Sequence, residues 1–206
     1  MIQAFYIIFL SFFVSNSLIA GDGIDCTSNE SIDASKKIIT LNSNVVKIVE
    51  KMNSQDLKNY EEADAFLQTI NKATDFNDDL VLIEINKVKP ICLNKNNEKI
   101  FLSKACTTLS RLHGKIAYKN KMNGLNDGKL FFKYVKKALQ INPQNSDAAL
   151  AYAKGVYGGH DQLSSTIVAT ALDINLEDET KNAIKAIEAT NQTSSSFYEL
   201  LKDELD

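Results

Sequence analysis

The chain has 206 residues, of which 44% are hydrophobic and 24% are charged. This length and composition suit one globular domain or one array of helices, and they exclude a disordered or fibrous chain. The net charge of −3 gives no general attraction to a phosphate backbone, so we expect no nucleic-acid partner. Only two prolines and eight glycines interrupt the sequence. Because both residues break regular helices, their scarcity predicts an all-α fold.

Residues 1–20 have the layout of a secretory signal peptide. They contain no charged side chain, and the run from Ile2 to Val14 is almost continuously apolar. Small and polar residues follow this run, and Ala20 is the expected residue before the cleavage site. No Lys or Arg precedes the apolar run, so a retained membrane anchor stays open as an alternative. The expected location is the periplasm or the exterior of the cell, with membrane contact only if this segment is retained.

Three cysteines bear on the compartment and the fold. Cys92 and Cys106 lie 14 residues apart around a segment rich in Asn and Lys, and in an oxidising compartment they are the favoured disulfide pair. Such a bridge contributes about 3 kcal/mol in the chain-entropy model. Cys26 is then free or paired between chains. The acidic Asp25 before it does not fit a lipid-attachment signal, and three unpaired thiols remain the alternative.

The expected elements follow in chain order. Residues 21–31 are polar and aperiodic, which predicts a flexible leader before a single helical domain over residues 32–206. Ser54 and Asp56 are the candidates to cap the second helix. Apolar spacing predicts helices over these ranges: 31–52, 54–73, 98–120, 127–141, 146–157, 162–172, 177–189 and 195–205.

One element is ambiguous. Residues 79–88 are apolar on several sides, so both a helix and a short buried strand over Leu80 to Ile85 fit the pattern. Pro90 is expected to end the element, because the residue before a proline avoids the helical region. Glycine and asparagine predict turns over residues 94–97, 123–128 and 158–161.

The chain contains an internal repeat. The segment from Lys137 to Pro143 is echoed by the segment from Thr170 to Leu176, and Ala138 and Ala171 are 33 residues apart (171 − 138). This offset is close to the 34-residue period of the tetratricopeptide (TPR) repeat. The similarity extends over about residues 109–189.

Individual positions carry this similarity and also limit it. In the matched segments the chain resembles the TPR family, whose second helix ends in an Ala-Leu pattern before a proline. Leu176 stands where a second proline is expected, and Phe131 stands where the family has a small residue. The resemblance implies antiparallel helical hairpins stacked as a short array. The alternative is a closed helical bundle in which similar helix ends recur by coincidence.

The resemblance also implies a binding surface. In TPR proteins the first helix of each hairpin lines the groove that holds a ligand. Transferred to this chain, that rule selects Asp147, Leu150, Lys154 and Tyr157 as partner-binding residues. Tyr157 offers an amphipathic anchor, and Lys154 offers a charge for a carboxylate or a backbone carbonyl.

Catalytic and metal chemistry finds little support in the residue pattern. His113 is expected within a helix, and His160 is expected in the turn of residues 158–161, where two glycines precede it. Two adjacent candidate ligands, His160 and Asp161, lack partners at helical spacing, so we expect no metal site. We also expect no cofactor and no catalytic residues, and hence no enzyme.

The functional hypothesis is an exported helical-repeat adaptor or scaffold that binds a protein or peptide of the cell envelope. The first alternative is an exported helical carrier of a small ligand, or an accessory subunit of a solute transporter. A second alternative is an exported enzyme or toxin. A pocket closed to solvent and lined by aromatic residues would favour the carrier, whereas an open groove would favour the adaptor.

Overall fold

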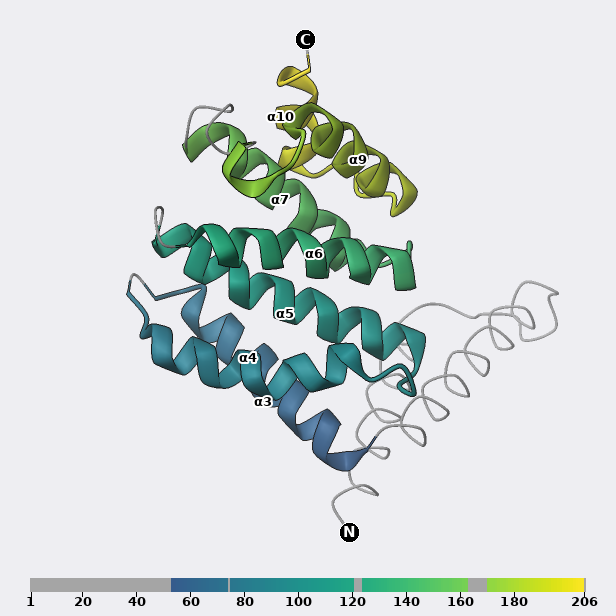
Figure 1. Cartoon of the computed structure of the whole chain (residues 1–206). Coiled ribbons are helices and arrows are strands. Elements are labelled where there is room, and N and C mark those ends of the chain that lie inside the picture. Colours follow the sequence, from purple (N-terminus) through teal and green to yellow (C-terminus); the bar gives the residue numbers. More distant parts are fainter. Residues whose placement is uncertain (1–52, 74, 121–123, 163–169, 206) are drawn as a thin grey trace, which may run out of the picture. The chain divides into compact units, whose positions relative to one another are not determined.

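The computed structural model describes residues 53–73, 75–120, 124–162 and 170–205, and their regular structure is helical throughout, without a strand (Figure 1). The helices are α3 Ser54–Ile70, α4 Asp78–Leu93, α5 Lys99–Lys119, α6 Leu125–Ile141, α7 Ser146–Gln162, α9 Leu176–Ala189 and α10 Ser196–Asp203. The prediction of an all-α fold is confirmed for these residues. The signal peptide, the leader, the first helix, Cys26 and most of the helix expected over 162–172 lie outside the described residues.

Asparagine side chains begin many of these helices. The side chains of Asn53, Asn77, Asn145 and Asn175 accept hydrogen bonds from backbone N–H groups in the first turns of α3, α4, α7 and α9, at 2.8–3.1 Å. Asparagine is among the best N-cap residues because its carbonyl satisfies a donor that has no partner inside the helix. The expected cap at Ser54 is therefore wrong by one residue.

The ambiguous apolar element is the helix α4, and the strand alternative is wrong. Pro90 does not end it, because the helix continues to Leu93. A proline inside a helix removes one backbone donor and crowds the carbonyl four residues before it, so its cost must be offset by the burial of its neighbours. Ile91 and Cys92, directly after the proline, are both almost completely buried. Burial therefore decides where this helix stops.

One predicted turn is shorter than expected, and another is absent. Helix α6 starts at Leu125, so Gly128 is helical and the turn ends earlier than expected. Helix α7 continues to Gln162, so residues 158–161 are helical and the turn expected there is wrong.

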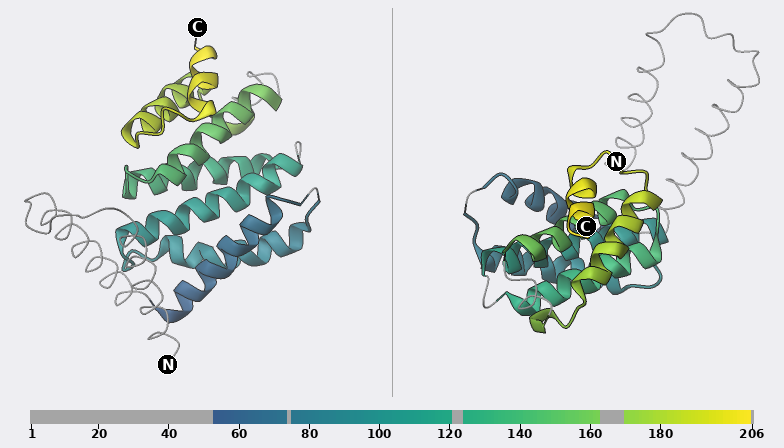
Figure 2. Two further views of the ribbon diagram at one scale, coloured as in Figure 1. Left: turned by 180° about the vertical axis from the view of Figure 1, so that it is seen from behind. Right: turned by 90° about the horizontal axis from the view of Figure 1, so that it is seen from above.

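Each helix packs against its neighbour in the sequence from α3 to α7; α9 and α10 then pack against α7 and each other. Figures 1 and 2 show this succession from three directions. The odd-numbered helices also touch, since α3 contacts α5 and α5 contacts α7. One hydrophobic core runs from Ala63 of α3 to Leu201 of α10. All these residues belong to one unit, Ile48–Asp206.

A single aromatic ring sets the approach of three helices. Phe131 of α6 lies against Gly114 of α5 and Gly155 of α7. A Cβ added at Gly155 would lie 2.1 Å from Cε1 of Phe131, and one added at Gly114 would lie 3.0 Å from Cδ2. The large residue is thus accommodated because the facing helices carry no side chain at the contact points.

Buried polar side chains fix the junction between α6 and α7. Helix α6 ends at Ile141, and Pro143 lies in the short turn that follows. Besides capping α7, Asn145 donates to the hydroxyls of Ser103 (2.8 Å) and Thr107 (3.1 Å) on α5. Ser103 donates in turn to the carbonyl of Ala138 at 2.8 Å. Every bond joins different elements, so the network holds the turn in register with α5.

A buried carboxylate connects the last part of the stack. Glu179 of α9 accepts hydrogen bonds from the Tyr152 hydroxyl of α7 and the Lys136 ammonium of α6. Tyr152 and Glu179 are 3% and 6% exposed. Burial, helped by the Glu179 carboxylate, raises the pKa of the Tyr152 hydroxyl well above its usual range, so it stays protonated and donates.

Candidate functional site

The candidate site is a face formed by α3, α5 and α7, which we call the odd-helix face and define by Tyr60, Arg111, Lys115, Asp147, Leu150 and Lys154. These three helices are neighbours in space although their residues are far apart in the sequence. The face includes three of the four predicted partner-binding residues, and Tyr157 lies one turn further along α7.

Tyr60 is the aromatic centre of this face. Its ring packs edge-to-face on Phe101 of α5, with centroids 5.3 Å apart. Its hydroxyl forms a hydrogen bond with Thr108, and the charges of Arg111 and Asp147 lie close enough to affect it. Partial burial, followed by the charge of Asp64, raises the pKa of Tyr60. The hydroxyl is therefore a neutral donor at any physiological pH.

The predicted residue Asp147 is already engaged within the chain. Nη2 of Arg111 donates to its backbone carbonyl at 3.1 Å and to its carboxylate Oδ1 at 3.4 Å. The Asp147 side chain is 66% exposed, and surface pairs of this kind contribute at most about 1 kcal/mol. A ligand can therefore displace the pair at little cost, or bind across it.

Lysines dominate the next turn of the face. Lys154 of α7 is exposed and lies one turn beyond the half-buried Leu150. Burial lowers the pKa of Lys115 in α5, and the charge of Lys154 lowers it further. The two lysines are therefore close enough to interact. Two ammonium groups brought together in this way attract an anionic group.

Tyr157 is placed less favourably than the sequence suggested. It is half-buried, packs against the hydrophobic core and lies with its ring centroid 6.1 Å from that of Phe197 in α10. Much of its surface therefore serves packing between α7 and α10, and its replacement would disturb the fold as well as a ligand.

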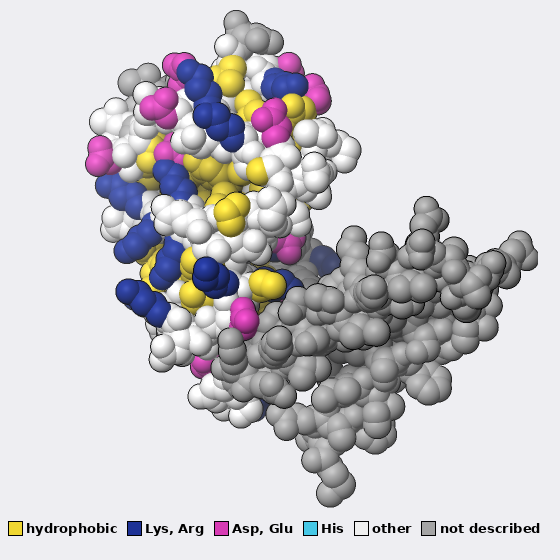
Figure 3. All heavy atoms as spheres, turned by 90° about the vertical axis from the view of Figure 1, so that its right-hand side faces the viewer, with side chains coloured by type: hydrophobic (Ala, Val, Ile, Leu, Met, Phe, Trp, Pro, Cys, Tyr) yellow, Lys and Arg dark blue, Asp and Glu magenta, His cyan; other side chains and the backbone are white. Residues whose placement is uncertain are grey.

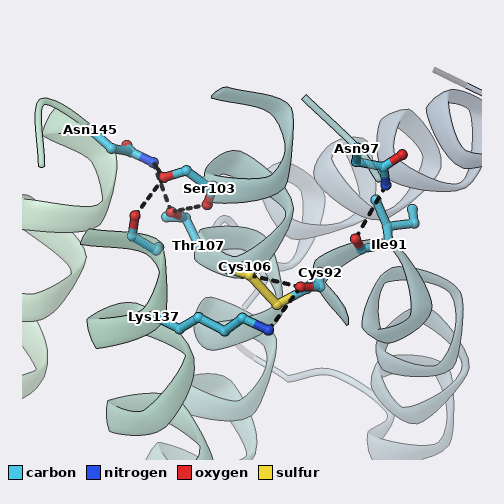
Figure 4. The surroundings of a disulfide bond; sticks show 9 residues. Ile91, Cys92, Asn97, Ser103, Cys106, Thr107, Lys137 and Asn145 are labelled. Carbon is cyan, nitrogen blue, oxygen red and sulfur yellow. Dashed lines mark hydrogen bonds between the residues drawn. A yellow bond between two sulfur atoms is a disulfide. The ribbon is translucent and has the colours of Figure 1, made fainter. Parts of the chain in front are cut away.

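The chain has a second group of lysines near the disulfide. Cys92 and Cys106 are bonded, as predicted, and join the end of α4 to α5. Lys137 of α6 donates to the Cys92 carbonyl at 3.1 Å (Figure 4). Burial and the charges of Lys133 and Lys95 lower its pKa. Figure 3 shows Lys and Arg side chains gathered beside hydrophobic ones on the side of the molecule it displays.

Both histidines contact carboxylates from other elements. The buried His113 of α5 has Nδ1 2.7 Å from Oδ1 of Asp127 in α6 and stacks on Tyr134, with centroids 5.6 Å apart. Burial lowers its pKa although Asp127 opposes the shift. His160 lies in α7 rather than a turn. Its Nε2 is 2.9 Å from the Thr180 hydroxyl, and its Nδ1 is 3.2 Å from a carboxylate oxygen of Glu204.

These histidine contacts connect helices. Each spans two elements, and the stacked His113 ring is 5% exposed, which leaves little of it open to a substrate. Within the described residues, no group of His, Cys, Asp and Glu side chains is arranged to hold a metal ion.

An open hollow of about 500 Å³ lies between the α3–α4 connection and the end of α5. Three of its six lining residues are acidic, and Lys119 crosses it. The Lys119 ammonium lies 3.4 Å from Asp75, 3.3 Å from Asp78 and 4.9 Å from the centre of the Phe76 ring. These contacts tie the connection to α5. The hollow is open and contains ion pairs, and it differs from the closed aromatic pocket expected of a carrier.

The sequence reasoning missed Tyr60, Arg111 and Lys115. The spacing of Arg111 and Lys115, four residues apart, places both on one helix face. No pattern within one helix could reveal that this face adjoins α7.

Comparison of the chain with protein-family models, with curated proteins and with solved structures gives no significant match. Among the described residues, none of the helices has the length and apolar character needed to cross a membrane.

Proposed function

We propose that this chain is an exported helical-repeat adaptor that binds a protein or peptide of the cell envelope through the odd-helix face. The observation that carries the proposal is the convergence of Tyr60, Arg111 and Asp147 from three successive odd-numbered helices. Side chains from such a row form a continuous surface along which an extended segment can lie, as in other helical-repeat proteins.

TPR-like stacking is part of this proposal. It is supported by the contacts of α3 with α5 and of α5 with α7, beside the contacts between successive helices. The buried Ala138 near the end of α6 and the turn at Pro143 agree with the repeat seen in the sequence. The helix starts depart from a strict period, because α7 begins 47 residues after α5 (146 − 99) and α9 begins 30 after α7 (176 − 146).

Charge defines the kind of segment that fits. Lys115 and Lys154 lie together at one part of the face, next to the half-buried Leu150. A ligand with acidic side chains beside an apolar one would neutralise both lysines and cover the leucine. Tyr60 and Arg111 supply donors for its backbone carbonyls.

Export is supported by two independent features. Residues 1–20 have the composition of a signal peptide. The disulfide between Cys92 and Cys106 is of a kind that persists in oxidising compartments. We therefore propose the periplasm or the cell exterior as the site of action, with binding rather than catalysis as the activity.

The test is site-specific photo-crosslinking in the native cell, followed by mass spectrometry. A crosslinking residue at Lys154 should capture a defined envelope protein, whereas the same residue at Lys185, an exposed lysine of α9, should not. Lys115→Glu should abolish capture from position 154 without changing helicity. Equal capture from both positions, or capture that survives Lys115→Glu, would refute the proposed face.

A further inference from the structure

Helix α4 has two apolar sides, and the described part of the chain covers only one of them. Its inner side packs on α3 and α5 (Figure 1). The buried residues of that side are Val81, Glu84, Ile85, Val88, Ile91 and Cys92. The opposite side is exposed along the whole helix, at steps of three and four residues that place its members on one face. We call it the outer α4 face, and it consists of Asp79, Leu82, Ile83, Asn86, Lys89, Pro90 and Leu93.

The exposed apolar area of this face is unusual for a surface helix. Leu82, Ile83 and Leu93 are 46%, 50% and 47% exposed, and Leu80 at the flank is 48% exposed. Four of the seven large hydrophobic residues that are exposed in the described part of the chain thus belong to this helix. Contiguous exposed apolar residues rimmed by polar ones mark an interaction surface.

The charges on the outer α4 face identify the occupant. Asp79 stands in the first turn, and Lys89 stands in the second half of the same exposed stripe. If two copies of the helix pair antiparallel, the acidic start of each lies beside the lysine of the other. The helix dipoles are then also opposed in the favourable sense. A surface that complements itself in this way fits a two-fold symmetric pair.

We propose that the outer α4 face is the interface of a homodimer, in which the α4 helices of two copies cross antiparallel near Ile83 and Asn86. The two copies bury Leu82 and Ile83 against each other, and each Asp79 faces the partner's Lys89. This surface lies on the side of α4 opposite its contacts with α3 and α5, and it shares no residue with the odd-helix face, which stays free for a ligand.

The interface is small, and its strength depends on concentration. A helix of this length is about 24 Å long. One face of it therefore offers less contact area than the roughly 800 Å² that each partner buries in a standard stable interface. We therefore expect a reversible dimer, visible by analytical ultracentrifugation of the full chain between about 1 and 100 µM.

Charge reversal provides the sharpest test. Asp79→Lys places two lysines opposite each other at both ends of the interface, and Lys89→Asp places two aspartates there, so each variant alone should be monomeric. An equimolar mixture of the two variants restores both opposite-charge contacts and should form heterodimers. Failure of the mixture to associate, with circular dichroism showing that both variants are folded, would overturn the antiparallel pairing.

A second pair of variants tests the apolar contribution. Ile83→Lys should abolish the dimer, while Leu205→Lys, which makes the same kind of change at another exposed aliphatic residue, should leave it intact. A wild-type chain that is monomeric at all concentrations overturns the proposal. So does a monomer in which Ile83→Lys increases amide exchange of residues 32–52, since the chain's own N-terminal segment would then be the occupant.

Discussion

Replacement of Tyr152 by Phe removes one hydroxyl from the buried contact among Tyr152, Glu179 and Lys136. The ring and its packing are kept, so the change isolates the hydrogen bond to the Glu179 carboxylate. Hydrogen bonds to charged groups contribute about 1.5–3 kcal/mol, and an unsatisfied buried acceptor adds a desolvation cost. Since Tyr152 and Glu179 are only 3% and 6% exposed, water cannot readily replace the hydroxyl. We expect a loss of about 2 kcal/mol.

The assay is urea unfolding followed by circular dichroism, supported by thermal unfolding. A loss of about 2 kcal/mol corresponds to a decrease of roughly 4–8 °C in the melting temperature for a chain of this size. The matched control is Tyr198→Phe, because Tyr198 also donates to a glutamate, Glu188, at 3.0 Å but in an exposed position. We expect the control to change stability by less than about 0.5 kcal/mol.

The pH dependence gives an independent readout of the same contact. The folded-state pKa of Tyr152 is raised above its usual value of 10.0. The protonated phenol therefore stabilises the fold fully below that value, and the contribution is lost as the pH rises further. Wild-type stability should fall above about pH 10, and Tyr152→Phe should remove part of this fall. Equal losses in the two Tyr→Phe variants would refute the reasoning.

The remaining predictions concern single structural features. Replacing Cys92 and Cys106 together by Ser should cost about 3 kcal/mol in urea unfolding, and an unchanged midpoint would show that the bridge contributes nothing. Gly155→Ala should cost about 1–3 kcal/mol through overpacking, whereas Gly158→Ala, where a Cβ meets open space, should gain about 0.5–1 kcal/mol; the same sign for both would contradict the packing. Because the pKa of His113 is lowered from 6.5, its neutral form stabilises the fold above that value and the contribution is lost as the pH falls. Titration of wild type and His113→Gln between about pH 5 and 7 should show a smaller decline in the variant.

Local sequence patterns predicted which segments are helical better than they predicted the residues where the helices begin and end. The disulfide was predictable because Cys92 and Cys106 flank a short polar loop between two apolar stretches. The end of α7 was not, because Gly158 and the glycine after it suggested a turn. Each glycine costs a helix only about 1 kcal/mol, and the helix continues past both to His160, which contacts Thr180 and Glu204. These contacts come from distant parts of the sequence, so no local pattern could reveal where α7 stops.

The candidate site was predictable only in part, for a related reason. The repeat register selected Lys154, which lies on the odd-helix face beside Lys115. It could not reveal Tyr60 or Arg111, because these residues reach the face from helices whose packing is set by contacts distant in the sequence. Tyr157 was selected by its position in the repeat and its amphipathic side chain, and its contact with Phe197 depends on the place of α10.

The packing of Phe131 against Gly114 and Gly155 has a consequence for engineering. The ring acts as a spacer whose size fixes how closely α6 approaches both α5 and α7. Exchanging it for leucine, or placing alanine on either opposing helix, would alter the separation and tilt of consecutive helices by small steps. The curvature of the proposed odd-helix face is thereby adjustable from a residue that is not part of it.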